Sequence, residues 1–494
     1  MMKHTLRTWS RLLAIAPALV VVAACSTNPA TGKQSFTGFM SPAKEKQVGA
    51  DEHPKMVKAF GGEFTAGDWQ AYIDDLGQEL AQYSELPDLN WTFTVLNDTK
   101  VNAFALPGGY VYITRGLLAL ASDEAEVAGV LGHEIGHVTA RHTAQRYSSA
   151  MAANLGVQVL GVLSRAYGVN GAQNIAALGA NLALKSYSRD QELEADKLGV
   201  RYIIRAGYDP DAMTSFFTKL RAQQRIEGLK AGDADRSERQ NMLATHPRTA
   251  DRILQAVKLA DKSGAAKANT RNARSFLKRI DGLVFGDDPE QGIIDGQTFI
   301  HPGLRFEFSV PDGFELQNSP SLVLAKDKKD NNIKFRGVSK KTVEDAGGME
   351  QFLTNKWKGG LSSRLKGVEW LEINGLPAVT GHARQDNLNV RRIVIEQDRD
   401  HYWMLQFVSN AQDTDRLNEP FRRTTYSFRE ITSREAARVP VKEIRVVTVG
   451  RGVTFDDLVA SMKVDEYKAE WFEAINGIGP DDPLIRGARV KVVK

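Results

Sequence analysis

The feature that most constrains this chain is a segment, residues 122–138, that combines helix-start signals with two histidines four residues apart. Either Ser122 or Asp123 can cap the amino end of a helix here, and the acidic residues that follow suit its positive end. His133 and His137 would then project from the same face of that helix. The spacing therefore predicts that both imidazoles can bind one metal ion.

The residue between them completes an H-E-x-x-H pattern, which predicts two zinc ligands and a general base on one helix. Glu134 lies about 100° around the helix from His133, so it is placed beside the ion rather than on it. With nine histidines in 494 residues, the pattern would arise by chance in roughly one such sequence in a hundred. Coincidence is therefore the weaker interpretation.

A catalytic zinc site needs a third protein ligand and an open position for water. The extended H-E-x-x-H-x-x-G-x-x-H pattern fails, because Ala140 stands where glycine is required, and His142 lies half a turn off the ligand face. Glu192, on a downstream helix, is the better candidate. Asp196 follows four residues later and can orient a histidine ligand through a hydrogen bond, whereas Glu194 is expected to be solvated.

An H-E-x-x-H pattern followed some 55 residues later by E-x-x-A-D resembles the zinc metallopeptidase family that contains the CAAX prenyl endopeptidase, HtpX and BepA-like proteases (peptidase family M48). Further matching segments are Asn102–Gly109, Tyr110–Gly116, Arg141-His142, Ser188-Arg189, Thr245-His246-Pro247 and Arg252. Together the matches span about residues 46–260. The resemblance implies a gluzincin fold with one Zn²⁺ per chain, bound by His133, His137 and Glu192.

The implied chemistry is metal-assisted hydrolysis of a peptide bond, with Glu134 as the general base. The tetrahedral oxyanion needs a second partner, and the resemblance implies that His246 or Arg252 supplies it. For His246 the alternative interpretation is a histidine that merely begins a helix beside a proline.

The strand that begins after Gly109, through Tyr110 and Val111, is predicted to offer an exposed edge for an extended substrate. This binding mode favours unfolded segments, so the leading hypothesis is an endopeptidase that degrades misfolded or unassembled envelope proteins. A second hypothesis is a chaperone-like outer-membrane assembly factor whose zinc site is masked, with residues 226–245 as the plug. A third is a scaffold or hydrolase associated with peptidoglycan.

The amino terminus predicts export. Three basic residues precede an apolar run, residues 12–24, that is too short for a spanning helix and is typical of a secretory signal peptide over residues 1–25. The run ends in Val-Ala-Ala-Cys, which resembles a bacterial lipobox, and Cys25 is the only cysteine. We expect lipidation at Cys25 and a periplasmic location, with Ser26 favouring the outer membrane. The alternative is a non-lipidated signal peptide with an incidental cysteine.

The remaining chain predicts an α+β protein of several parts. After a flexible tether, residues 26–45, comes a mainly helical peptidase domain with a small sheet over 46–262. A linker over 263–296 leads to an antiparallel α+β domain over 297–432, which loosely resembles PsbP/Mog1 proteins. Residues 440–494 read as strand, helix, helix and strand, an order that resembles the LysM module. That module would bind peptidoglycan or act only as a structural cap.

Two further features limit the partners. The net charge of +4 is small and gives no reason to expect nucleic acid. The Ala- and Leu-rich runs 150–164 and 172–184 are too short to span a bilayer, so we expect buried helices or a flap over the active site.

Overall fold

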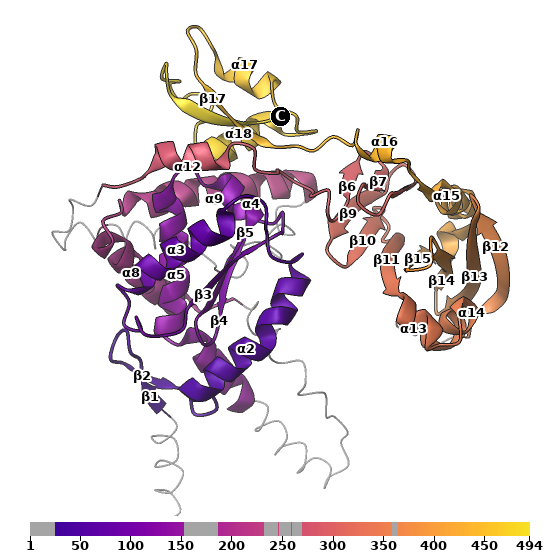
Figure 1. The fold of residues 1–494 in the computed structure, drawn as a ribbon, viewed down its shortest axis with the longest axis horizontal. Coiled ribbons are helices and arrows are strands. Elements are labelled where there is room, and N and C mark those ends of the chain that lie inside the picture. Colours follow the sequence, from indigo (N-terminus) through magenta and orange to yellow (C-terminus); the bar gives the residue numbers. More distant parts are fainter. Residues whose placement is uncertain (1–24, 153–185, 232–245, 247–257, 259–268, 358–363) are drawn as a thin grey trace, which may run out of the picture. The chain divides into compact units, whose positions relative to one another are not determined.

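The chain divides into two compact units (Figure 1). The computed structural model describes residues 25–152, 186–231, 246, 258, 269–357 and 364–494. Unit 1 runs to Leu283 and takes up the chain again over Glu443–Lys494, and unit 2 comprises Val284–Lys442. Both units contain helices and strands, which confirms the α+β fold class at that level.

The described part of unit 1 begins with a short antiparallel hairpin of β1 (Cys25–Thr27) and β2 (Gln34–Phe36). Helix α2 (Pro42–Ala59) follows, and the side chain of Ser41 caps its amino end. Residues 26–45 are thus folded into a hairpin and the start of a helix, which differs from the flexible tether predicted for them. The difference arises because partners elsewhere in unit 1, described below, bind this segment.

Three strands form the sheet of the peptidase-like region: β3 (Thr92–Leu96), β4 (Ala103–Leu106) and β5 (Tyr110–Thr114). The strand order is β3-β5-β4, with β3 parallel and β4 antiparallel to β5. Gly108 and Gly109 connect β4 to β5 with φ angles of 86° and 96°, a left-handed conformation that favours glycine. These two glycines make the tight connection between the antiparallel strands.

The predicted edge strand is wrong. Gly109, Tyr110 and Val111 lead into the central strand of the sheet, where Val111 pairs with Phe93 on one side and Ala105 on the other. The sequence pattern identifies β5 as a strand but does not give its position in the sheet, where β4 pairs with it on one side and β3 on the other. The edge strands of this sheet are β3 and β4.

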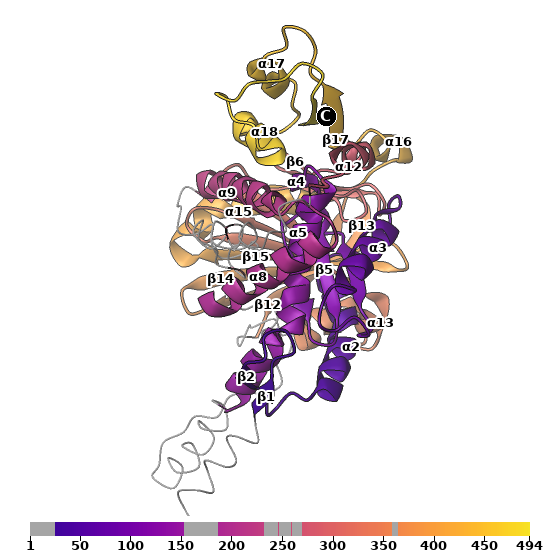
Figure 2. The same cartoon turned by 90° about the vertical axis from the view of Figure 1, so that its left-hand side faces the viewer.

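Helix α5 (Glu124–Thr139) is buried over most of its length and packs along α8 (Arg189–Arg205) (Figures 1 and 2). Gly199 allows the close approach, because a Cβ atom there would lie 2.9 Å from the backbone nitrogen of His133. The other helices of this region are α3 (Trp69–Ala81), α4 (Arg115–Leu120), α9 (Asp211–Ala231) and α12 (Ala273–Ile280). Among the helices that the structure describes, none is long and apolar enough to cross a bilayer. Most of the two apolar runs predicted as buried helices or a flap lies outside the described residues.

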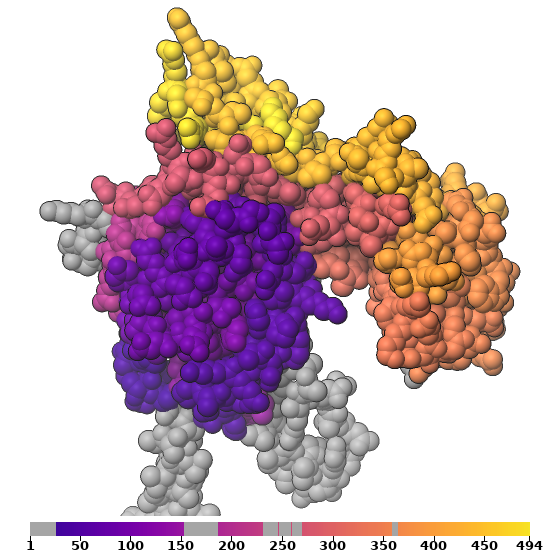
Figure 3. All heavy atoms as spheres, viewed as in Figure 1, coloured from indigo at the N-terminus to yellow at the C-terminus, as the bar shows by residue number. Residues whose placement is uncertain are grey.

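The carboxyl-terminal segment of unit 1 follows the order strand, helix, helix, strand. Its elements are β17 (Ile444–Thr448), α17 (Phe455–Ala460), α18 (Lys468–Asn476) and β18 (Arg489–Val493). Strands β17 and β18 pair in antiparallel fashion, and α18 packs against α9. In Figure 3 this yellow segment lies directly on the pink helix α12 and its neighbours. The resemblance to a LysM module stays a prediction.

Unit 2 contains a seven-stranded sheet of order β12-β13-β14-β15-β11-β10-β9 and a four-stranded sheet of order β16-β8-β7-β6. Its strands are β6 (Ile293–Asp295), β7 (Thr298–His301), β8 (Phe306–Ser309), β9 (Glu315–Ser319), β10 (Leu322–Lys326), β11 (Asn332–Ser339), β12 (Lys366–Ile373), β13 (Leu376–Gln385), β14 (Leu388–Glu396), β15 (His401–Asn410) and β16 (Arg429–Glu430). Its described helices are α13 (Lys340–Glu344), α14 (Met349–Gln351), the π-helical turn Phe352–Lys356, the 3₁₀ turn Ala411–Asp413, α15 (Thr414–Ser427) and α16 (Ser433–Ala436). Buried aromatic side chains form its core, among them Phe306, Phe335 and Phe407.

Candidate metal centre

The amino end of α5 is fixed by a side-chain cap. Of the two residues predicted for this role, the structure selects Asp123, whose carboxylate accepts a hydrogen bond of 2.9 Å from the backbone N–H of Glu126. Helix α5 then continues through alanine, glycine and aliphatic residues that pack in the interior, so that its carboxyl half is buried around the two histidines. The helix predicted from the sequence is confirmed.

Three predicted metal ligands meet in the interior between α5 and α8. The Nε2 atoms of His133 and His137 lie 2.9 Å apart, as expected for residues on one helix face. One carboxylate oxygen of Glu192 lies 3.4 Å from Nε2 of His137, and the other lies 3.7 Å from Nε2 of His133. All three side chains have no exposed surface.

A fourth donor joins them. Nδ1 of His246 lies 2.9 Å from Oε1 of Glu192 and 3.3 Å from Nε2 of His133. The sequence suggested that His246 stabilises an oxyanion, whereas the structure places it among the donor atoms themselves. The sequence motif around His246 indicated a role at the site, but not that its ring lies among the metal donors. Arg252, the other residue suggested for the oxyanion, lies outside the described residues.

The donor set fits zinc. Suitable atoms of His133, His137, Glu192 and His246 all lie within 4.8 Å of one another. Donors bound tetrahedrally to zinc at about 2.0–2.1 Å are roughly 3.3–3.4 Å apart, and the pairwise distances given above, 2.9–3.7 Å, bracket that value. Imidazole nitrogens with one carboxylate are a set that zinc prefers.

The ionisation of two ligands suits a cation. Burial lowers the pKa of His137 well below its ordinary value, so its imidazole is neutral and has a free lone pair to offer a metal. Burial alone would raise the pKa of Glu192, but the imidazoles of His246 and His137 outweigh it and hold that pKa well below its usual range. The carboxylate is therefore ionised.

Two more predicted residues lie where the sequence placed them. Oδ1 of Asp196 is 2.9 Å from Nδ1 of His133, a position from which it fixes the ring so that Nε2 faces the other donors. Oε1 of Glu134 lies 3.6 Å from Nε2 of His246, beside the donor cluster and with no exposed surface. This placement suits a group that exchanges protons with a reactant rather than one that binds the ion.

Tyr187 was not predicted to belong to the site. Its ring stacks on that of His137, with centroids 3.8 Å apart and planes 22° from parallel, and it lies 5.4 Å from the ring of His246. Tyr187 stands in an irregular segment just before α8, where no periodicity assigns a direction to its side chain. Only the contacts of the folded chain bring it to the site.

Comparison with known proteins agrees with this site. Residues 68–260 match the model of peptidase family M48. The putative beta-barrel assembly-enhancing protease of Vibrio cholerae is 36% identical over 189 residues, 37% of each chain. The beta-barrel assembly-enhancing protease of Escherichia coli K12 is 31% identical over 192 residues, again 37% of each chain. The mitochondrial metalloendopeptidase OMA1 of Arabidopsis thaliana is 34% identical over 228 residues, 43% of this chain and 44% of that protein.

The chain thus spans less than half the length of these relatives. A solved structure of PsbP from Synechocystis covers 29% of this chain and 98% of its own, with a TM-score of 0.22 and 16% identity, which supports no conclusion. The metallopeptidase match contains all four donors and Glu134 and agrees with the predicted zinc cofactor. Residues 68–260 therefore belong to the zinc metallopeptidases of family M48.

Proposed function

We propose that this protein is a zinc-dependent endopeptidase of the bacterial cell envelope that acts on misfolded or unassembled envelope proteins. The observation that supports it best is the buried meeting of four metal donors with Glu134 beside them. The relatives named for beta-barrel assembly and the export signal at the amino terminus support the substrate class.

Each residue of the site would have a separate role in hydrolysis. Zinc held by these donors would supply an acidic water, with a pKa of about 7, and would polarise the peptide carbonyl. Glu134 would accept a proton from the attacking water and return it to the leaving amine. Asp196 would hold the ring of His133 in the orientation that exposes Nε2.

Strand β4, rather than β5, is the edge strand that supports a mode of substrate binding. It is one of the two outer strands of the sheet, and it packs beside α5, the helix that presents His133 and Glu134. An extended peptide could add to such an edge through backbone hydrogen bonds. Folded substrates seldom offer a free strand, so this mode favours unfolded chains.

The activity is tested by hydrolysis of an unfolded protein such as casein with the full chain. We expect activity that a chelator removes and added zinc restores, and we expect Glu134→Gln to lower it by about 10²–10⁴-fold. Glu79→Gln, an exposed carboxylate on α3, is the matched control and should leave the activity unchanged. Equal activity of Glu134→Gln and the wild type would exclude the proposed general base.

His246 has a separate test, because a catalytic zinc site keeps one position for water. In the structure its ring stands among the donors, so it would have to withdraw before water enters. We therefore expect His246→Ala to raise the rate of casein hydrolysis. Removal of an oxyanion partner would instead lower the rate by about 10²–10³-fold, and that result would restore the role suggested from the sequence.

The proposed location is the periplasmic face of the outer membrane, through a lipid on Cys25. The lipobox-like sequence before Cys25 and the serine after it support this location. Membrane fractionation of the full chain and of Cys25→Ala tests it, since only the wild type should sediment with membranes. Binding of residues 440–494 to peptidoglycan is supported by their order of elements alone, and a pull-down with insoluble peptidoglycan tests it.

A further inference from the structure

The second ligand histidine has a partner on its outer side. Nδ1 of His137 lies 2.9 Å from Nδ1 of His142, and both side chains are buried. Because Nε2 of His137 faces the donor cluster, its proton belongs on Nδ1. Nδ1 of His137 then donates to His142, and Nδ1 of His142 must accept.

This assignment also determines whether the other ring nitrogen of His142, Nε2, carries a proton. Its proton lies on Nε2, which is 3.0 Å from Oε2 of Glu194, a carboxylate that can accept it. The hydrogen bonds therefore run in one direction, from His137 to His142 to Glu194. We refer to these three residues as the relay.

The two ligand histidines are thus held in different ways. Nδ1 of His133 meets the carboxylate of Asp196 directly, whereas His137 reaches the carboxylate of Glu194 through a second imidazole. Asp196 is fully buried, but the side chain of Glu194 retains 18% of its exposure. The relay therefore connects the buried donor cluster to the surface of the protein.

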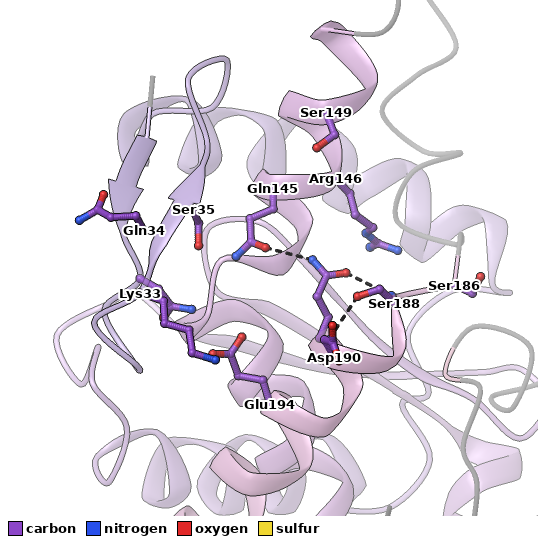
Figure 4. A pocket seen from close by; sticks show the side chains of 12 residues that line it. Lys33, Gln34, Ser35, Gln145, Arg146, Ser149, Ser186, Ser188, Asp190 and Glu194 are labelled. Atoms are coloured by element: carbon purple, nitrogen blue, oxygen red, sulfur yellow. Dashed lines mark hydrogen bonds between the residues drawn. The ribbon is translucent and has the colours of Figure 1, made fainter. Parts of the chain in front are cut away.

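Glu194 ends in a pocket that the amino-terminal hairpin helps to form. Figure 4 shows this pocket between strands β1 and β2, the helical residues 142–152 and the start of α8, with Lys33 and Glu194 pointing toward each other. Lys33 lies in the turn of the hairpin, so the hairpin places a cation opposite the carboxylate at the outer end of the relay.

Arg141 fixes the hairpin beside the relay. This residue follows α5 in a left-handed conformation with φ of 57°, which is unfavourable for a residue with a side chain. Its guanidinium donates to Oγ of Ser26 and to the carbonyl of Met40, each at 2.7 Å, and to Glu45 at 2.9 Å. Arg141 thus binds the hairpin, and the next residue, His142, contacts the metal ligand His137.

We propose that His142 and Glu194 are positioning residues that hold the ring of His137 for metal binding, and that the hairpin β1–β2 completes this relay at its outer end through Lys33. The inference rests on the proposed zinc site. It assigns a role in that site to residues 25–36, which lie outside the matched family segment, residues 68–260.

The test is the zinc affinity of the purified full chain, measured by competition with a chromogenic chelator, so that no activity is required. We expect His142→Leu to weaken zinc binding about 10–100-fold, the usual effect of removing a partner of a metal ligand. His142→Gln should retain more affinity than His142→Leu, because an amide can accept from His137 and donate to Glu194. A purely structural side chain would not show this order.

Glu194→Gln keeps the test decisive if His142→Leu fails to fold, because Glu194 is partly exposed. We expect it to weaken zinc binding, whereas Asp190→Asn, an exposed carboxylate on the same helix and in the same pocket, should bind zinc as the wild type does. Wild-type affinity in Glu194→Gln and in a folded His142→Leu would overturn the relay. Absence of zinc from the wild type would instead overturn the proposed function itself.

The contribution of the hairpin is measured with Lys33→Ala. An exposed charged partner is worth up to about 1 kcal/mol, so we expect zinc affinity to fall by up to about five-fold. Gln34→Ala changes an exposed residue of the same hairpin that bonds Thr27, and it should have no effect. Equal affinities for Lys33→Ala and Gln34→Ala would remove the hairpin from the proposal.

Discussion

Helix α5 has a cluster of buried polar groups at each end, and the carboxylates of the two clusters have different kinds of partner. At the amino end, both carboxylate oxygens of Glu126 accept hydrogen bonds from Nζ of Lys219, at 2.8 and 2.7 Å. Asp123 lies 3.0 Å from a guanidinium nitrogen of Arg271. At the carboxyl end, the carboxylates of Glu192 and Asp196 face imidazoles instead.

The difference distinguishes a structural cluster from a metal centre. The amine of Lys219 and the guanidinium of Arg271 neutralise the carboxylates at the amino end, so that cluster is complete within the protein. The donors at the carboxyl end are lone pairs of neutral imidazoles with a carboxylate, which together attract a cation. Each of the following predictions changes one of the two clusters and asks whether the other responds.

The largest effect should come from removing a metal donor. Glu192→Ala takes away the only carboxylate among the four donors, so we expect loss of stoichiometric zinc while the amino-end cluster stays intact. Elemental analysis after dialysis measures the metal, and circular dichroism checks the fold. Retention of one zinc per chain would show that Glu192 is not a ligand.

The next largest effect should come from breaking the amino-end pair. Lys219→Met leaves Glu126 buried without its cation, which should lower the free energy of unfolding by about 3–5 kcal/mol. Denaturant unfolding measures this change. The double variant Lys219→Met/Glu126→Leu should recover most of the loss, because two apolar side chains remove the uncompensated charge. A loss below about 1 kcal/mol in the single variant would contradict the assignment of this pair as structural.

A smaller loss in the free energy of unfolding is expected where the carboxyl-terminal segment of unit 1 contacts the residues just before the amino end of α5. Nζ of Lys491 is fully buried and donates to the carbonyls of Ala119, Leu120 and Ala121 at the end of α4. Lys491→Met should cost about 1.5–3 kcal/mol, as for hydrogen bonds from a charged donor. Lys463→Met, an exposed lysine of the same segment, should stay within about 0.5 kcal/mol of the wild type. Equal free energies of unfolding for Lys491→Met and Lys463→Met would contradict this anchoring role of Lys491.

The smallest effect is expected at the surface of the same contact. Arg225 on α9 pairs with Glu473 on α18, but both side chains are partly exposed. Glu473→Gln should therefore change the free energy of unfolding by less than about 1 kcal/mol. Thermal unfolding of Glu473→Gln and Lys491→Met, measured side by side, compares the exposed ion pair with the buried amine. A larger loss of stability in Glu473→Gln than in Lys491→Met would contradict this prediction.

The sequence predicted those parts of the site that depend on helical spacing. His133 and His137 are four residues apart, as are Glu192 and Asp196, and each pair needs only the local geometry of one helix to share a face. The cap at Asp123 is likewise a local signal. These residues lie where they were expected, so three of the four donors could be named before the structure.

The parts that the sequence did not predict depend on packing between distant segments. Glu194 was expected to be solvated, but the approach of α5 to α8 and the left-handed turn at Arg141 bring His142 against it. Strand β5 was taken as an edge because alternation of residues identifies a strand but not its neighbours, and both β3 and β4 pair with it. Tyr187 and His246 themselves lie in neither a helix nor a strand, so periodicity gives their side chains no direction.

The most direct test of the account is the zinc content of the full chain, measured for the wild type, Glu134→Gln and Lys219→Met. We predict one zinc per folded chain in all three, with casein hydrolysis lost only in Glu134→Gln, because neither substituted residue is a metal ligand. Absence of zinc from the wild type would contradict the assignment of the carboxyl end of α5 as a metal centre.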